Sequence, residues 1–213
     1  FVDRINGLSY EEIALKGGGI LNSAKAMEKI SEEELFEKSM RIVEKIKHSG
    51  TTALEIKSGY GLSKESELKM LKVIKKIKEK SGIKIKATLL AAHAYPNEFK
   101  NNHQGYLDII INEIIPEVSK NKLAEYIDVF CERNYFSVEE MEQVLKAGKK
   151  HNLTPKVHVN QFSILGGIQK AIEYNALSVD HLEEIDEKDL EILESSDCIA
   201  TMLPGCSHFL GIP

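Results

Sequence analysis

Short apolar runs and helix-like segments alternate along this chain, and this alternation limits the folds that it can adopt. The runs are rich in apolar and β-branched residues, and several end in Gly, Pro or polar turn residues. The six runs cover 51–61, 83–94, 126–132, 154–161, 177–183 and 197–205. Strands that alternate with helices in this way lie parallel, because each right-handed crossover returns the chain to the end of the sheet where the previous strand began. The pattern predicts an α/β fold, either a barrel or an open doubly wound sheet.

The segments between the runs have helical periodicity. One apolar stripe consists of Leu68, Met70, Leu71, Val73, Ile74 and Ile77. The charged residues of the same helix are predicted to form its solvated face: Lys64, Glu65, Glu67, Lys69, Lys72, Lys75, Lys76, Lys78, Glu79 and Lys80. Capping boxes are predicted at Ser31 with Glu34 and at Ser137 with Glu140. Glycines at positions 50 and 82 are expected to end two helices.

Length and charge narrow the class of protein. With 213 residues, 42% hydrophobic and 29% charged, the chain is expected to form one domain, 1–213. A net charge of -5 and a pI near 5.9 argue against a nucleic-acid partner. No apolar stretch approaches the roughly 20 residues of a membrane span, so a cytoplasmic protein without a membrane partner is expected. The chain begins without Met, and we expect it to be part of something longer.

Three cysteines, Cys131, Cys198 and Cys206, form no C-x-x-C pair. Their odd number predicts neither a disulfide framework nor a thiolate zinc site, and it fits a reducing compartment. Cys131 ends an apolar run, and it is expected to be buried packing rather than a nucleophile.

Three histidines end three of the strand-like runs. They are His93 in ATLLAAHAYP, His158 in LTPKVHVNQ and His181 in LSVDHLEE. No G-x-G-x-x-G motif starts a helix, which argues against the open doubly wound sheet. Candidate functional residues at several strand ends favour a barrel of the (β/α)8 type, of which the sequence predicts six strands. Alternation places His158 on the opposite face from its valine neighbours. A histidine packed in the core, or in a turn for His93, remains the alternative for each one.

Glycines at two other places suggest backbone turns near these strand ends. Tyr60 lies between two glycines directly after the first run, where the phenol can supply a hydrogen bond to a small molecule. A tight strand-to-helix turn explains the glycines equally well. Gly166 and Gly167 are expected to start a helix. Gly17, Gly18 and Gly19 lack the Lys and Ser/Thr of a phosphate-binding loop, so phosphate is discounted.

Seven tracts, in order, resemble the imidazolonepropionase family of the amidohydrolase superfamily. They are SYEEIALKGGGI, LEIKSGYGL, LLAAHAYPNEF, DVFCERNYF, KVHVNQFSILGG, ALSVDHLEE and TMLPG. The resemblance implies a metal-dependent hydrolase with one divalent ion, zinc or iron, that converts 4-imidazolone-5-propanoate to N-formimidoyl-L-glutamate in histidine degradation. It implies a (β/α)8 barrel that lacks here the strand with the family's His-x-His and the strand with its Asp.

The resemblance also assigns roles. The metal ligand maps to His158, the catalytic histidine to His181, and the substrate-contacting residues to Tyr10, Tyr60 and His93. Gln161 stands where better-known members have a Glu near the substrate and the water. A neutral amide can hydrogen-bond the ring but cannot be a base, which shifts proton transfer toward His181. The family's substrate-binding Arg would precede the first residue.

Two other functions stay open. One is a different amidohydrolase, such as a deaminase of a cyclic amidine, because the barrel and the metal chemistry are shared. The other is a catalytically incomplete scaffold, since three of the four expected ligands are absent and open barrel edges are sticky. A homodimer is a family expectation only.

Overall fold

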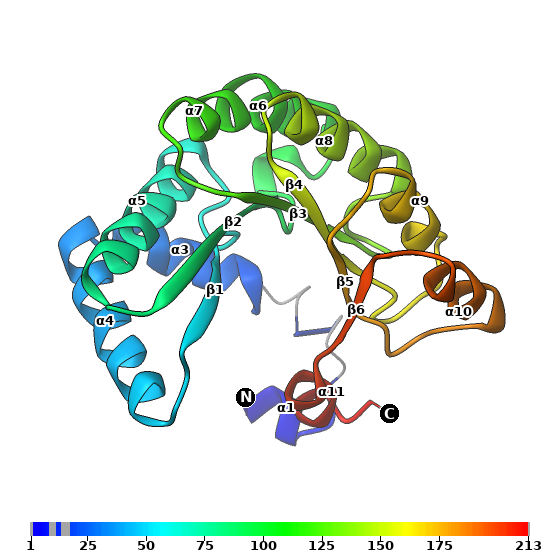
Figure 1. The fold of residues 1–213 in the computed structure, drawn as a ribbon, viewed down its shortest axis with the longest axis horizontal. Helices are drawn as coiled ribbons and strands as arrows, with labels where there is room; N and C mark the ends of the chain where they lie inside the picture. Colours follow the sequence, from blue (N-terminus) through cyan, green and yellow to red (C-terminus); the bar gives the residue numbers. More distant parts are fainter. Residues whose placement is uncertain (1, 9–11, 14–17, 213) are drawn as a thin grey trace.

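The computed structural model describes residues 2–8, 12–13 and 18–212, and its centre is one parallel sheet of six strands. The strands lie in chain order, and each pairs in parallel with the next. They are β1 (Ala53–Lys57), β2 (Lys84–Ala92), β3 (Tyr126–Cys131), β4 (Thr154–Val159), β5 (Ser178–His181) and β6 (Ile199–Met202). All six predicted strands are confirmed. The sheet curves into an open half-barrel, as Figure 1 shows.

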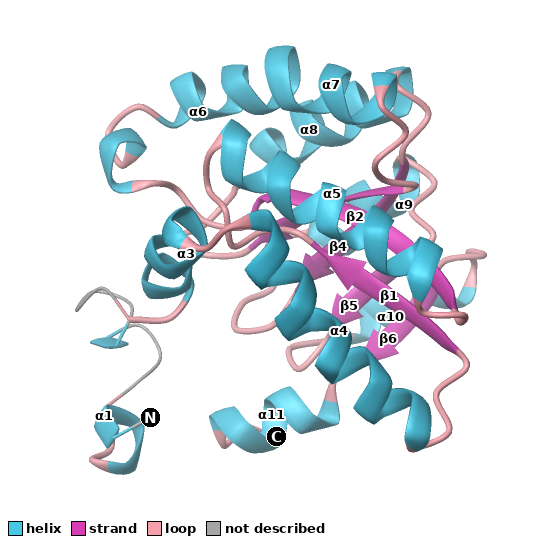
Figure 2. Ribbon diagram, turned by 90° about the vertical axis from the view of Figure 1, so that its left-hand side faces the viewer, coloured by secondary structure: helices cyan, strands magenta, loops and turns pink. Residues whose placement is uncertain are grey.

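Helices follow each strand, and most of them cover the outer, convex side of the sheet (Figures 1 and 2). The helices up to the third strand are α1 (Val2–Ile5), α3 (Ile20–Lys29), α4 (Glu32–His48), α5 (Lys64–Lys80), η1 (Asn97–Phe99), α6 (His103–Ile109), η2 (Ile110–Ile114) and α7 (Ile115–Lys120). The later ones are α8 (Val138–Lys150), α9 (Gly167–Glu173), α10 (Glu187–Glu194) and α11 (Pro204–Leu210). The strand–helix order is that of a partial (β/α)8 fold.

The two faces of the sheet differ in chemistry. Ile127, Val129, Val157 and Val179 belong to the main buried core, which fills the space between sheet and helices. Residues that alternate with them point to the concave side and are largely polar. They include Glu55, Lys57, Thr88, Asp128, Lys156, His158 and Asp180. The predicted orientation of His158, opposite to its valine neighbours, is confirmed.

Local capping signals explain where several helices begin and end. Ser137 and Glu140 form the predicted reciprocal capping box at the start of α8. Ser31 accepts a hydrogen bond from the Glu34 amide, 3.1 Å away, which is the half of its predicted box that the structure records. The glycines at 50 and 82 have φ of 93° and 72° just past α4 and α5, as expected for residues that end helices.

One residue of the predicted solvated face of α5 was placed wrongly. Glu67 has no exposed surface. It lies four residues before Leu71 and therefore shares the buried face of the helix. Glu65 and Lys72 are exposed as predicted.

The last strand is an open edge. On β6, Ile199 and Met202 expose 56% and 68% of their surface, and no further strand pairs with it among the residues described. The three cysteines are free, and Cys131 is buried as predicted. No helix within the described ranges is long and apolar enough to cross a membrane.

Candidate active site

The carboxyl ends of the strands bring four of the predicted site residues together. The ring centroids of Tyr60 and His93 lie 5.1 Å apart, and those of His93 and His158 lie 6.4 Å apart. The rings of His158 and His181 are 5.2 Å apart. The Phe130 ring lies beside these imidazoles, with its centroid 5.9 Å from that of His93 and 6.4 Å from that of His181. Three imidazoles at or just past the ends of separate parallel strands therefore form one cluster, while their chemical roles stay predictions.

Asp128 of β3 holds His158 of the neighbouring strand. Its Oδ1 accepts hydrogen bonds from the backbone N of His158 at 3.2 Å and from ring Nδ1 at 3.0 Å. A carboxylate only accepts, so Nδ1 carries the hydrogen and Nε2 keeps its lone pair in the neutral ring. This is how carboxylates orient metal-binding histidines in proteins.

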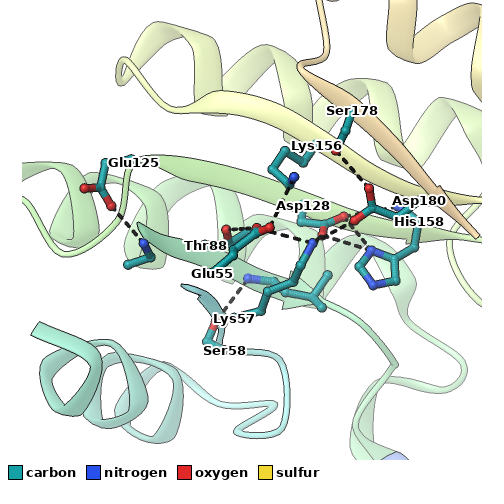
Figure 3. Close-up of polar contacts among 12 residues, drawn as sticks. Glu55, Lys57, Ser58, Thr88, Glu125, Asp128, Lys156, His158, Ser178 and Asp180 are labelled. Carbon is teal, nitrogen blue, oxygen red and sulfur yellow. Dashed lines mark hydrogen bonds and ion pairs between the residues drawn. The ribbon is translucent and has the colours of Figure 1, made fainter. Parts of the chain in front are cut away.

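Lys57 of β1 contacts the same carboxylate, as Figure 3 shows. Its Nζ is 2.6 Å from Oδ2 of Asp128 and 3.0 Å from Oδ2 of Asp180. Burial opposes the charge of Lys57, but the two carboxylates outweigh it and raise the lysine pKa. Burial likewise disfavours the Asp128 carboxylate, yet His158 and Lys57 hold its pKa far below the usual range. Both groups are therefore charged at neutral pH.

Asp128, His158 and Asp180 offer three ligand atoms within 4.8 Å of one another, a spacing that can hold a metal ion. The ammonium of Lys57 is bonded to both carboxylates of this group. A metal between the two carboxylates would have to displace that ammonium. Nε2 of His158 is free of this competition.

His181 reaches the cluster through a strained backbone. By strict alternation it would share a face with Val179, toward the helices. Its φ of 94° is followed by a φ of 67° at Leu182, and both are rare for residues other than glycine. This turn places the ring beside His158, on the concave side. Strain of this kind gathers at functional sites.

Two buried polar atoms near His181 lack hydrogen-bond partners. Nδ1 of His181 and Oε2 of Glu183 lie 3.4 Å apart, within ion-pair range, and neither makes a hydrogen bond. Burial and the nearby His158 lower the pKa of His181, against the opposing effect of Glu183. The other Glu183 oxygen accepts a hydrogen bond from Ser207 of α11 at 2.7 Å. Buried polar atoms that make no hydrogen bond are uncommon in folded proteins.

His93 is a neutral imidazole with a fixed orientation. Its Nδ1 lies 2.9 Å from the carbonyl oxygen of Gly59, so Nδ1 donates and Nε2 can accept. Burial and the neighbouring His158 lower the pKa of His93 to about 4. The side chain therefore presents an acceptor to the site at neutral pH.

A buried carboxylate shapes the loop that carries Tyr60. Glu67 accepts hydrogen bonds from the amides of Gly59, Gly61 and Leu62 at 3.0, 2.7 and 3.0 Å. Gly59 has φ of 103°, and a Cβ there would lie 2.9 Å from Leu90. The tight-turn explanation thus accounts for the glycines. Tyr60 itself remains 39% exposed beside His93.

Gln161 lies in the loop after β4 and contacts Cys206. The Gln161 side chain is buried, and its Nε2 lies 3.6 Å from Sγ of Cys206. Its loop is held by Glu132, whose Oε2 accepts from the amides of Phe162 and Ser163 at 2.8 and 3.2 Å. Tyr10 lies outside the described residues. The predicted helix start at Gly166 and Gly167 is confirmed in α9.

Sequence reasoning missed Lys57, Asp128 and Glu67. A signal existed for Glu67, because it falls on the apolar face of its helix. A signal existed for Asp128 as well, since a charged residue among the apolar residues of a strand points away from the core. The contacts of Lys57 join strands 71 and 123 residues apart in sequence, and no local pattern reveals them.

The sequence is similar to several curated imidazolonepropionases. That of Flavobacterium johnsoniae is 56% identical over 213 residues, which are 100% of this chain and 52% of the relative. Those of Christiangramia forsetii and Aliivibrio fischeri are 53% and 46% identical, over 100% and 99% of this chain and 52% of each relative. The chain thus spans about half the length of the curated relatives it matches. No protein-family model matches it.

Solved structures of low sequence identity share the fold. An adenine deaminase from Arthrobacter aurescens superposes with a TM-score of 0.68 at 13% identity, covering 90% of this chain and 58% of that one. A guanine deaminase from C. acetobutylicum with bound guanine in its active site gives 0.63 at 16% identity, covering 89% and 48%. At such identities the likeness concerns the fold alone.

The parallel strands and these neighbours define the fold class, a partial (β/α)8 barrel. Its sequence is similar to those of curated imidazolonepropionases, which are 44–56% identical over 97–100% of this chain.

Proposed function

We propose that the chain contributes to the hydrolysis of the cyclic amide C–N bond of 4-imidazolone-5-propanoate, which gives N-formimidoyl-L-glutamate. The observation that carries this proposal is the convergence of Tyr60, His93, His158 and His181 in a chain 56% identical to an imidazolonepropionase. The small molecule is the proposed partner, and a cytoplasmic location follows from the same metabolic role.

The residues present fit a divalent metal ion, zinc or iron, in part. His158 would bind it through Nε2, because Asp128 occupies Nδ1. The ring of His181 lies beside that of His158, with centroids 5.2 Å apart, and its Nδ1 is 3.4 Å from Oε2 of Glu183. When bound, such an ion lowers the pKa of water from about 15.7 to roughly 7 and so makes it a nucleophile at neutral pH.

Proton transfer is assigned to His181. Glu183 lies nearest Nδ1, which leaves Nε2 to accept a proton from the attacking water and to return it to the leaving nitrogen. The lowered pKa of His181 keeps the ring neutral and ready to accept. Gln161 is proposed to hydrogen-bond the substrate ring, since its amide can donate and accept hydrogen bonds. It is not assigned as the base, because an amide nitrogen is not basic.

Substrate binding is assigned to Tyr60 and His93, with Tyr10 as a third contact that the described residues do not include. The phenol of Tyr60 can donate one directed hydrogen bond, and Nε2 of the neutral His93 can accept one. These two groups would fix the imidazolone ring or its propionate next to His158.

The open sheet supports a proposal on domain organisation. A closed barrel of this kind needs eight strands, and six are present. We propose that residues 1–213 are part of one amidohydrolase barrel, whose other metal ligands come from strands that would pair with the edges β1 and β6. A homodimer is proposed on family grounds alone.

The test is turnover by the complete gene product. Purified with zinc or with iron, it is expected to hydrolyse 4-imidazolone-5-propanoate in preference to a panel of cyclic amides and amidines, including adenine, guanine and cytosine. Preferential deamination of a nucleobase would contradict the proposal and favour the deaminase alternative. A product without metal and without turnover would favour the scaffold.

A further inference from the structure

A charged lysine lies at the centre of the concave face, among three acidic side chains. Nζ of Lys57 is 2.6 Å from Asp128, 3.0 Å from Asp180 and 3.4 Å from Glu55. Its side chain is 22% exposed, and that of Asp128 is not exposed at all. Lys57 thereby ties β1 to β3 and β5 next to His158, as Figure 3 shows.

Asp128 is shared between this lysine and the histidine above it. Oδ2 accepts from Lys57, and Oδ1 accepts from the backbone N of His158. The ring Nδ1 of His158 lies 3.0 Å from Oδ1 and 2.9 Å from Oδ2. Because both the Lys57 ammonium and His158 hold this carboxylate, it cannot rotate without breaking a charge-assisted hydrogen bond. The orientation of the His158 ring therefore depends on the place of the ammonium.

The ammonium also determines which atoms remain for a metal. By spacing alone, Asp128, His158 and Asp180 could take a cation between them. Lys57 supplies that positive charge from within the chain and engages both carboxylates. Among these three residues, Nε2 of His158 is the ligand atom left free.

We propose that Lys57 is a positioning residue. It holds Asp128 so that His158 keeps its hydrogen on Nδ1 and presents the Nε2 lone pair at the mouth of the barrel, and it keeps cations out of the Asp128–Asp180 pair. This inference rests on the proposed function only in taking His158 as the metal ligand. A purely structural ion pair would stabilise the sheet without affecting the tautomer of His158.

Lys156 provides a matched control. It is on the same concave face, its side chain is 11% exposed, and its Nζ pairs with Glu55 at 3.2 Å. Lys57→Met and Lys156→Met each remove one buried ammonium from an acidic partner, and both are expected to lower stability. Only the first variant removes the group that holds Asp128.

The experiment measures the His158 tautomer and zinc affinity in the complete gene product. With 15N-histidine labelling, assigned by comparison with His158→Asn, the wild type and Lys156→Met are expected to show Nδ1–H in the metal-free protein. Lys57→Met is expected to show a mixture of tautomers and to bind zinc about 10- to 100-fold more weakly in competition with a chelator. Lys57→Arg, which keeps the charge, is expected to recover part of both.

Equal tautomers and equal zinc affinity in Lys57→Met and Lys156→Met would overturn the proposal. If Lys57→Met does not fold, Lys57→Gln removes the ammonium while keeping a polar side chain, and an unchanged tautomer with unchanged zinc affinity there would overturn the proposal too. The tautomer is read without substrate or metal. The two proposals can therefore fail separately. If the wild type does not hydrolyse imidazolonepropionate but Lys57→Met still shifts the His158 tautomer, the proposed function is refuted and the positioning role of Lys57 stands.

Discussion

Replacing Glu67 tests whether one buried carboxylate builds the Tyr60 loop. Glu67→Ala leaves the amides of Gly59, Gly61 and Leu62 without their acceptor. An unsatisfied buried donor costs about 1–3 kcal/mol. Because water can reach part of the loop once the side chain is gone, we expect a total loss of about 3–5 kcal/mol in the free energy of unfolding. Glu67→Gln keeps the shape but turns an NH2 group toward one amide, so we expect about 1–3 kcal/mol.

The assay is urea unfolding followed by circular dichroism, with Glu65→Gln as the control. Glu65 is on the same helix and exposed, so its loss should stay within about 0.5 kcal/mol. Glu67→Gln is expected to fold, and in it KM is expected to rise more than kcat falls, because the residue that its loop displaces is Tyr60. The reasoning is refuted if Glu67→Ala unfolds at the same urea concentration as Glu65→Gln.

Three further predictions concern the histidines and a cysteine. His181→Ala should lower kcat by about 10²- to 10⁴-fold with metal content retained, whereas His48→Ala, at an exposed position, should change neither; loss of metal would reassign His181 as a ligand. Because the pKa of His93 falls from 6.5 to about 4 on folding, the unfolded chain binds the extra proton, and stability should decrease as pH is lowered through that window, by up to about 3 kcal/mol. Urea unfolding at several pH values checks this, and His93→Gln should flatten the dependence; an unchanged slope would contradict it. Burial raises the pKa of the Cys131 thiol to about 12, so iodoacetamide should modify Cys131 only after unfolding, as peptide mass spectrometry would show; rapid labelling of the folded protein would be the contrary result.

Local patterns were sufficient for the fold. The period of the apolar residues separates strands from helices, and the glycines after α4 and α5 adopt the positive φ that ends them. Alternation also placed His158 correctly, because both valines beside it are buried in the core. These features depend on neighbours in sequence, which is why sequence reasoning could reach them.

The supporting residues of the site were harder to predict. The His181 ring lies beside His158 because the backbone at His181 has a positive φ, which the residue type does not predict. Lys57 contacts Asp128 and Asp180 on other strands of the curved sheet, far away in sequence. Glu67 was assigned to the solvent because charged residues usually lie there. Its burial is explained by three loop amides that donate hydrogen bonds to its carboxylate. These contacts form only when the loop folds back on the helix.

The most direct test of this account is a crystal structure of the complete gene product with zinc, with the metal located by its anomalous scattering. The account predicts a zinc ion bonded to Nε2 of His158 at about 2.0–2.1 Å, with Lys57 still bonded to Asp128 and Asp180. A zinc ion between these two carboxylates, with the lysine displaced and Nε2 of His158 unligated, would contradict it.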